Sequence, residues 1–358
     1  MTLILSNEEI ESVLGMADCV EVLERLYREL ADGRALVRQR SDIIVPGPEP
    51  GTVYGLKSMD GVSPAWEVGA VRINSDLVRW PVRNGFTRRE KVPAAPGGRW
   101  VGLVLLFSSR TGEPLAILPD GVIQRMRVGG TGGLAVRHLA REDASVAAIL
   151  GSGWQAGAAL MAAHAVRPLR EVRVYSPNPE HRAAFAREWE EKLDLPVRSA
   201  RSGREAVAGA DIVLAATNAL EPVFEGAWAE AGMHLGCVRQ HELGEAVLRR
   251  ADVVAVNAHE GIPQHLMHPE VSHYAELSGG RGWTGVASDM VEGSLLLAEI
   301  VAGRGPRRTS PDQITVFLNN IGLGAQFAAV GAHVLERAHA RGLGRELPTE
   351  WFTQDVHP

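Results

Sequence analysis

The sequence predicts an α/β protein that combines a doubly wound parallel sheet with a separate α+β domain. From residue 144 onward, short apolar runs alternate with helical stretches, which is typical of a parallel sheet. Before residue 126, β-like runs follow one another without long helices between them, which indicates an antiparallel or mixed sheet. A chain of 358 residues is also longer than one hydrophobic core usually serves. We expect one domain from residues 1–125 with 320–358, and another from residues 126–319.

The first domain opens with a helical pattern. Between residues 8 and 32, apolar side chains such as Val13, Val20, Leu23 and Tyr27 recur at helical spacing, as one helix or two. Short β-like runs bounded by Pro, Gly and Asp clusters come next. These runs cover residues 43–45, 53–56, 70–73, 101–107 and 115–118.

The second domain begins with a small-residue helix at 126–139 and an apolar strand at 145–150. Further strands are expected at 171–175, 196–198, 212–216, 234–238, 253–257 and 313–318, with helices at 155–166, 179–192 and 204–209. The last helix, 322–341, is rich in Ala and Val and has a full apolar face. A finished doubly wound sheet has no place for that face. We therefore expect this helix to return to the first domain or to pack on a partner subunit.

Composition excludes several classes of protein. A net charge of −6 and a pI near 6.1 argue against a nucleic-acid binder, which normally has a concentrated basic face. The basic run at 79–91 is interpreted as a solvated loop, with a lid or an oligomer contact as the alternative. The sequence shows neither a signal peptide nor an apolar run long enough to cross a bilayer. Two distant cysteines, Cys19 and Cys237, indicate no disulfide framework, so we expect a cytoplasmic protein, and we expect no metal site.

A glycine-rich turn follows the strand at 145–150. The segment Gly151 to Ala156 reads Gly-x-Gly-x-x-Ala and leads into a helix. Gly151 permits a tight turn, Gly153 lets the backbone approach a diphosphate, and Ala156 lets the helix pack close to the sheet. The N–H groups at the start of that helix then hold the phosphates. The turn, preceded by a strand and followed by a βαβ pattern, predicts a Rossmann dinucleotide site rather than a purely structural glycine turn.

The second strand of this pattern ends without an acidic residue. An Asp or Glu at that position would bind the ribose hydroxyls of NAD and repel a 2′-phosphate. Here Ser176, Asn178 and Arg182 stand near the strand end, which favours NADP, with NAD as the alternative. Against this, Ser176 and Asn178 could simply form the turn while Arg182 lies at the surface. The residues we expect at the cofactor are Gly151, Ser152, Gly153, Trp154, Gln155, Ala156, Ser176, Asn178, Arg182, Thr217, Asn218 and Val238.

Several motifs together resemble the ornithine cyclodeaminase and mu-crystallin family. They occur in the family's order along nearly the whole chain: Met59-Asp60-Gly61, Thr111-Gly112-Glu113-Pro114, Gln124-Arg125-Met126-Arg127-Val128, Gly151 to Ala156, Ala215-Ala216-Thr217-Asn218 with Glu221-Pro222-Val223, Gly232-Met233-His234, and Ile314-Thr315-Val316-Phe317. The resemblance implies a substrate-binding and dimerisation domain completed by the C-terminal helix, a Rossmann domain, and a homodimer. Family members include amino acid dehydrogenases, imine reductases, cyclodeaminases and a binding protein of the lens.

The resemblance also implies roles for four basic residues. Arg40 and Arg127 match the two arginines that bind the substrate carboxylate, a task that suits guanidinium groups because they grip both oxygens and stay charged. The alternative for each is an ordinary salt bridge. Counted from Met59, the family's catalytic lysine falls on Arg72 and an acidic position falls on Lys57. A rival alignment makes Lys57 the catalytic lysine. In both alignments Lys57 is the better proton donor, because the pKa of a buried lysine shifts readily.

The chain departs from the cyclodeaminase pattern at residues 235–242. The family's aspartate is missing from this stretch, although His241 or Glu242 could replace it. Together with Lys57 in the other acidic position, this absence argues against ring closure of ornithine. The hypothesis is reduction of a C=N or C=O bond beside a carboxylate of a small anionic amino, imino or keto acid. A cyclodeaminase and a non-catalytic NADP-binding protein are the alternatives, and the insertion 82–98 has no assigned role.

Overall fold

The computed structural model describes residues 1–83, 86–87, 89–259, 264–271 and 293–356. It divides into two compact units. The first unit comprises Met1–Arg127, Ile262–Leu277 and Leu323–Pro358, and the second comprises Val128–Gly261 and Ser278–Gly322. The chain therefore returns to the first unit twice, once at Ile262–Leu277 and again from Leu323 onward.

A mixed sheet forms the centre of the first unit. Its main path runs β17-β3-β4-β5-β9-β10-β1-β20, with β2 and β8 paired to its sides. Most pairs are antiparallel, while β17 with β3 and β1 with β10 are parallel. The strands are β1 (Thr2–Ile4), β2 (Leu36–Val37), β3 (Ser41–Pro46), β4 (Thr52–Ser63), β5 (Val68–Arg79), β8 (Glu90–Val92), β9 (Val101–Ser108), β10 (Pro114–Pro119), β17 (Gln264–Met267) and β20 (Arg345–Leu347), beside a separate pair of β6 (Val82–Arg83) and β7 (Phe86–Thr87).

Strands β4 and β5 are much longer than the short runs expected at 53–56 and 70–73. Both alternate between buried and more exposed positions along their length. The alternation continues through polar residues such as Lys57 and Asp76, whose side chains point to the buried face. The expected strands were therefore too short, because the sequence analysis followed only apolar residues and ended each strand at the next polar side chain.

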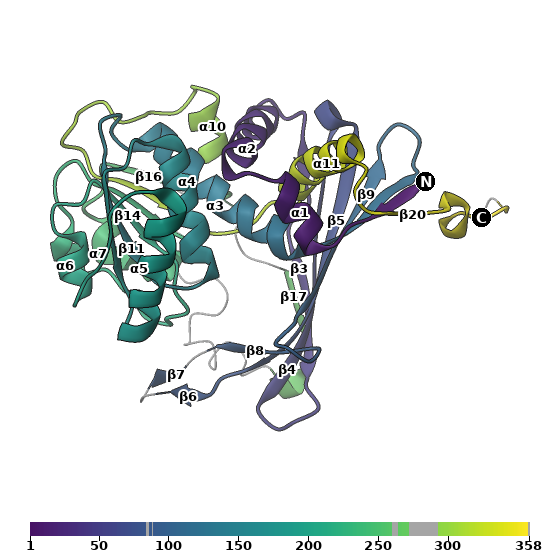
Figure 1. Ribbon diagram of the computed structural model, residues 1–358, viewed down its shortest axis with the longest axis horizontal. Coiled ribbons are helices and arrows are strands. Elements are labelled where there is room, and N and C mark those ends of the chain that lie inside the picture. The colour runs from purple at the N-terminus through teal and green to yellow at the C-terminus, as the bar shows by residue number, and fades with distance from the viewer. Residues whose placement is uncertain (84–85, 88, 260–263, 272–292, 357–358) are drawn as a thin grey trace. The chain divides into compact units, whose positions relative to one another are not determined.

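Helices cover one face of this sheet. The helical pattern at 8–32 is two helices, α1 (Asn7–Val13) and α2 (Met16–Ala31). The long helix α11 (Gly324–Arg341) packs across β4 and β5 (Figure 1). The backbones touch where it begins, since a Cβ on Gly324 would stand 2.0 Å from the carbonyl group of Asp60, and one on Gly61 would stand 2.3 Å from Ala325 N. Only glycine fits at either position.

The second unit is a doubly wound parallel sheet, as the sequence predicts. Its order is β13-β12-β11-β14-β15-β19-β16-β18, and every pair is parallel. The strands are β11 (Val146–Leu150), β12 (Glu171–Tyr175), β13 (Val197–Ser199), β14 (Ile212–Ala215), β15 (His234–Cys237), β16 (Val253–Val256), β18 (Leu295–Leu296) and β19 (Thr315–Leu318). The helices are α4 (Trp154–Val166), α5 (Pro179–Leu193), α6 (Gly203–Val207), α7 (Gly244–Leu248) and α10 (Leu297–Val301).

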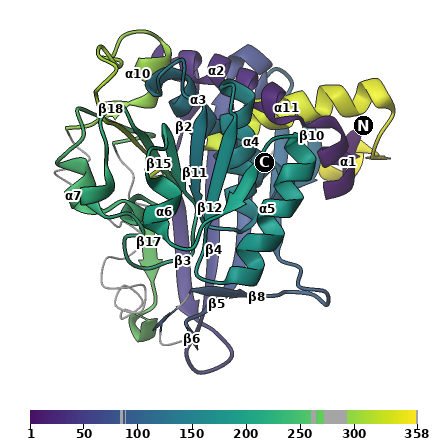
Figure 2. The ribbon, with the colours of Figure 1, turned by 60° about the vertical axis from the view of Figure 1, so that its left-hand side comes forward.

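Two apolar cores lie on opposite faces of this sheet. Helices α4 and α5 bury one core against β11 and β12, as Figure 2 shows, while α6 and α7 contribute to the other. Helix α3 (Asp120–Leu139) runs from the first unit into the second. Its last carbonyls are bound by two arginines: Arg167 donates to the carbonyls of Arg137 and Ala140, and Arg308 donates to that of Leu139. These bonds satisfy acceptors that a helix leaves open at its C-terminus.

Candidate functional site

The buried face of the first sheet gathers charged side chains. Across β3, β4 and β5, Asp42 stands opposite Lys57, and Lys57 opposite Asn74. One step along the strands, Met59 stands opposite Arg72. Because side chains two residues apart share a face, Lys57 and Arg72 both point to the buried side. Lys57 and Arg72, the two rival positions for the family's catalytic lysine, are therefore neighbours on one face of the sheet.

Lys57 is bound to a carboxylate that a second lysine shares. Its Nζ donates to Asp76 Oδ2 at 2.7 Å, and Lys91 Nζ lies 2.6 Å from Asp76 Oδ1. Burial lowers the pKa of Lys57 to about 7, helped by the charge of Arg89 and opposed by Asp76. Burial alone would raise the pKa of Asp76, but the two ammonium groups outweigh it and hold that pKa below its usual value. Lys57 thus has the titration range of a general acid at neutral pH.

Two arginines of the first unit lie over the ring of Phe327 in helix α11, Arg72 and Arg127. Arg72 donates from Nε and Nη2 to Asp120 Oδ2, at 2.8 and 2.6 Å. Arg127 donates to the side-chain oxygens of Gln326 and Gln124, at 3.1 and 2.6 Å. Burial lowers the pKa of Arg127 to about 9, and the charge of Arg72 adds to the effect. Burying a charged guanidinium group costs free energy, so arginine side chains are buried mainly where they bind an anion or a carboxylate.

Arg40 forms a two-pronged salt bridge with Asp42, as expected if it did not bind the substrate. Its Nε and Nη2 donate to the two oxygens of Asp42, at 2.8 and 2.7 Å. Its charge still acts on both Lys57 and Arg127. Arg40 is therefore within electrostatic range of Lys57 and Arg127, and Arg127 is within that of Arg72. Lys91, Asp76 and Asp120 complete the group, and sequence reasoning missed all three.

The glycine turn of the second unit has the geometry of a phosphate-binding turn. Gly151 has a φ of +122°, and a Cβ there would stand 2.3 Å from the carbonyl oxygen of Ala216. Gly153 is the N-cap of α4, and a Cβ there would meet open space. Ala156 is fully buried against the sheet. The N-terminal end of α4 is therefore uncrowded, as a helix end that binds a phosphate must be.

The end of β12 carries hydroxyl and guanidinium groups in place of an acid. Ser152 Oγ donates to Ser176 Oγ at 2.8 Å. Arg182 lies over the ring of Tyr175 and donates to the carbonyl of Ser176 at 2.9 Å. The side chain of Asn178 caps helix α5 by accepting from the N–H groups of residues 180 and 181. Asn178 therefore has the structural role in the turn that was the alternative to binding the cofactor, while Arg182 is held near the end of the strand.

A buried carboxylate joins the loops after β14 and β15. Glu242 Oε1 accepts hydrogen bonds from the backbone N–H of Thr217 at 2.6 Å and from its hydroxyl at 2.7 Å. Glu242 Oε2 accepts from the N–H groups of Val238 at 3.2 Å and Arg239 at 2.8 Å. Thr217, Asn218 and Val238 were expected near the cofactor, and Glu242 fixes the segments that carry them. The sequence offered Glu242 only as a substitute acid, because no spacing rule reveals a carboxylate that binds loop backbones.

Neither a metal cluster nor a membrane span is found in the described ranges. No three His, Cys, Asp or Glu side chains among those residues are arranged to hold a metal ion. Among the described helices, none is long and apolar enough to cross a membrane.

The chain is similar to one protein family and to several named enzymes. A model of the ornithine cyclodeaminase/mu-crystallin family matches residues 86–342. The chain is 31% identical over 254 residues to a Delta(1)-pyrroline-2-carboxylate reductase of Bacillus cereus, covering 69% of this chain and 74% of that protein. It is 26% identical over 358 residues to the alanine dehydrogenase of Archaeoglobus fulgidus, covering 97% and 98% of the two chains.

The fold is also found in a solved structure of a related enzyme. The Delta(1)-pyrroline-2-carboxylate reductase of Thermococcus litoralis, determined in complex with NADH and L-proline, superposes with a TM-score of 0.77 at 28% identity. The match covers 97% of this chain and 100% of that one.

Proposed function

The chain belongs to the ornithine cyclodeaminase/mu-crystallin family, and we propose that it is an NAD(P)-dependent oxidoreductase that reduces an imine or keto group beside a carboxylate. The observation that carries this proposal is the buried group around Lys57. A lysine with a pKa near 7 stands among arginines in a chain that also has a dinucleotide turn. These are the parts that a reductase of anionic substrates needs: a carboxylate site, a proton donor and a hydride carrier.

Each basic residue has a proposed role. Arg127 binds the substrate carboxylate together with Arg40, which keeps its salt bridge to Asp42, and Arg72 places a further positive charge beside it. Lys57 donates the proton, because a guanidinium group keeps its proton across the ordinary pH range. When bound, the nicotinamide supplies a hydride to the carbon of the C=N or C=O bond. The Lys57 ammonium gives its proton to the nitrogen or oxygen, which leaves an amine or alcohol and a neutral lysine.

We propose NADP as the preferred cofactor and NAD as the alternative. Ser176 and Arg182 at the end of β12 favour a 2′-phosphate, and the described tip of that strand carries no acid that would repel it. The Thermococcus litoralis relative was solved with NADH, so both cofactors belong in the test. We expect kcat/KM to be higher with NADPH than with NADH. A clear preference for NADH would overturn the assignment.

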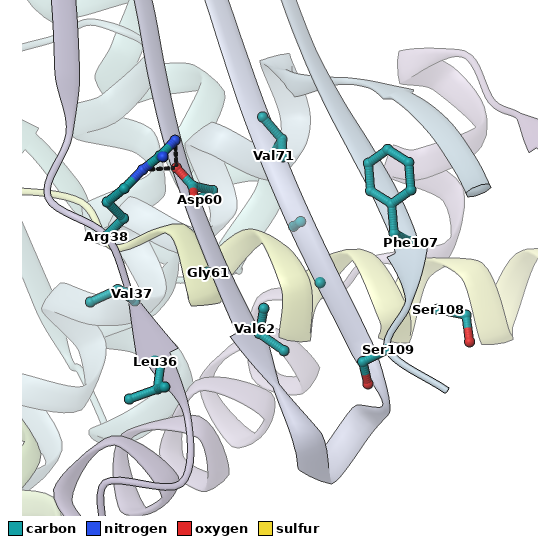
Figure 3. A pocket seen from close by; sticks show the side chains of 12 residues that line it. Leu36, Val37, Arg38, Asp60, Gly61, Val62, Val71, Phe107, Ser108 and Ser109 are labelled. Carbon is teal, nitrogen blue, oxygen red and sulfur yellow. Dashed lines mark hydrogen bonds and ion pairs between the residues drawn. The ribbon is translucent and has the colours of Figure 1, made fainter. Parts of the chain in front are cut away.

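We propose a homodimer formed through the open face of the first sheet. Ile43, Leu56 and Val101 share one row across the sheet on the face opposite Lys57, and each is 38% exposed or more. The same face has a hollow of about 500 Å³, which Figure 3 shows with Val62 and Phe107 in its lining. An apolar face of this extent is typical of a subunit interface. The buried, free cysteines Cys19 and Cys237 fit the reducing cytoplasm that we propose as its location.

A charge placed on this face tests the dimer. Leu103 is 39% exposed on it, and Leu103→Glu should convert a dimer to a monomer in light scattering. Val356→Glu, at a position 74% exposed near the C-terminus, is the matched control and should keep the mass of the unchanged protein. A monomeric parent protein, or a Leu103→Glu dimer, would contradict the proposal.

The catalytic proposal is tested by following cofactor oxidation. NADPH and NADH are offered with pyrroline-2-carboxylate, which relatives are named for reducing, with its six-membered analogue, and with pyruvate plus amines. Ammonia release from ornithine is measured in parallel. Consumption of cofactor with one of the imine or keto acids is the expected result. Ammonia release without net cofactor consumption would identify a cyclodeaminase, and cofactor binding without either reaction would identify a binding protein.

A further inference from the structure

The chain uses lysine very sparingly. Of its 37 basic residues only three are lysines, namely Lys57, Lys91 and Lys192. Lys192 lies on α5 and forms an exposed ion pair with Glu188. The other two lysines bind the two oxygens of one buried carboxylate, Asp76. Two of the three lysines thus share one carboxylate whose side chain is only 1% exposed. Lysine differs from arginine in that burial can bring its pKa close to neutral pH.

The insertion 82–98 supplies the second of these lysines. Strand β8 lies within it and pairs antiparallel with β5, which sets Lys91 opposite Val78. Residues 84, 85 and 88 of this insertion lie outside the described residues. Lys91 Nζ reaches back to Asp76 Oδ1 at 2.6 Å. A segment interpreted from the sequence as a solvated loop therefore contributes a side chain to the buried group.

The two lysines differ in their access to water. The side chain of Lys57 is 4% exposed, that of Asp76 is 1% exposed, and that of Lys91 is 35% exposed. Burial lowers the pKa of both lysines, and Asp76 opposes the effect in each case. Water can stabilise the charged form of Lys91 but not that of Lys57. Because water reaches it, we expect Lys91 to keep its proton over the pH range in which Lys57 titrates.

A shared carboxylate makes the two ammonium groups compete. Each takes one oxygen of Asp76, so neither has the full negative charge as its counterion. The other charges facing Lys57 are Arg40 and Asp42 from the side of β3 and Arg89 from the insertion. Arg40 is already bound to Asp42 through both oxygens. Asp76 is therefore the main anion available to Lys57, and Lys91 takes part of it.

We propose that Lys91 is a positioning residue for the proton donor: by sharing Asp76 it fixes the Lys57 ammonium group and sets the pH at which that group releases its proton. This inference rests on the proposed function, because a proton donor matters only in a reaction. The titration of Lys57, however, can be measured without any substrate. The two proposals can therefore fail separately.

The scarcity of lysine makes a direct titration practical. The intact protein, labelled with lysine carrying ¹³C at the ε position, gives three ε-carbon signals, and Lys192→Arg identifies the exposed one. The titration midpoint of Lys57 is then followed by NMR in Lys91→Met and Lys91→Arg. Loss of the neighbouring charge should raise the midpoint in Lys91→Met by about one pH unit, while Lys91→Arg, which keeps the charge, should leave it near that of the parent.

Two further results decide the matter. Asp76→Asn removes the shared charge and should move the midpoint of Lys57 in the opposite direction, to lower pH, by about one unit or more. In the pH profile of kcat/KM, the alkaline limb should move with the NMR midpoint in each Lys91 variant. A midpoint in Lys91→Met that stays or falls, or one in Asp76→Asn that does not fall, overturns the role of Lys91. An unchanged protein that reduces no substrate, whatever its lysines do, overturns the proposed function instead.

Discussion

Replacing the two glycines of the turn before α4 should separate folding from cofactor binding. Gly151→Ala places a methyl group 2.3 Å from the carbonyl oxygen of Ala216 at a φ of +122°. The positive φ costs about 1–3 kcal/mol for a residue with a side chain, and a clash with backbone that cannot move aside costs a similar amount. We expect Gly151→Ala to lower the free energy of unfolding by about 4 kcal/mol and to abolish measurable NADPH binding.

The matched change two residues later should behave differently. Gly153 has a φ of −94°, and a methyl group there meets no atom within 4 Å. Gly153→Ala should therefore change the free energy of unfolding by no more than about 0.5 kcal/mol. In the proposed cofactor site the diphosphate approaches the backbone at Gly153, so the added methyl group should raise Kd for NADPH about tenfold or more. Urea unfolding without cofactor gives the first quantity, and a fluorescence titration with NADPH gives the second.

Two outcomes would refute this reasoning. A Gly151→Ala protein that unfolds at the same urea concentration as its parent would show that the turn is not tightly constrained. A Gly153→Ala protein that binds NADPH as tightly as its parent would show that no diphosphate lies against this turn, and the cofactor site would then lie elsewhere.

Three further predictions concern other parts of the site. Glu242→Gln replaces one carboxylate oxygen, such as Oε2 with its two N–H donors, by an NH₂ group that can only donate. The free energy of unfolding should therefore fall by about 2 kcal/mol, and an unchanged urea midpoint of unfolding would contradict the role of Glu242 in fixing the loops. Arg127→Met keeps the buried volume but loses the charge, so KM for a carboxylate substrate should rise about 10- to 100-fold in steady-state kinetics, whereas a KM within twofold would remove Arg127 from the carboxylate site. In the proposed mechanism reduction needs the ammonium form of Lys57, whose pKa is lowered to about 7. We therefore expect kcat/KM to fall as pH rises above about 7, and a flat profile up to pH 9 would exclude Lys57 as the donor.

Local patterns of the sequence predicted the second unit well. The turn at Gly151, the parallel strands and the helices between them each depend on residues close together in the chain. The family resemblance is likewise confirmed, because it rests on motifs that keep their order along the chain. The position of β19 between β15 and β16 could not be predicted, since strand order depends on packing rather than on sequence order.

The charged group of the first unit was only partly predictable. Lys57, Arg72, Arg40 and Arg127 were found by their resemblance to family positions. Their anionic partners were not, because a carboxylate such as Asp76 looks like any surface residue until the register of β4 and β5 turns it inward. Lys91 was hidden for a second reason. It lies in the segment 82–98, to which the sequence motifs assigned no role, and only the pairing of β8 with β5 brings it to Asp76.

The contact between Gly61 and Gly324 has a consequence for how the protein is made. The ribosome produces β4 early, but the helix that begins at Gly324 emerges only after the whole second unit has been synthesised. Until then, the charges around Lys57 lack part of the cover that α11 gives them. The first unit can therefore be completed only after synthesis has passed Leu323, whereas every strand of the second sheet, within Val128–Gly261 and Ser278–Gly322, has been synthesised before that point.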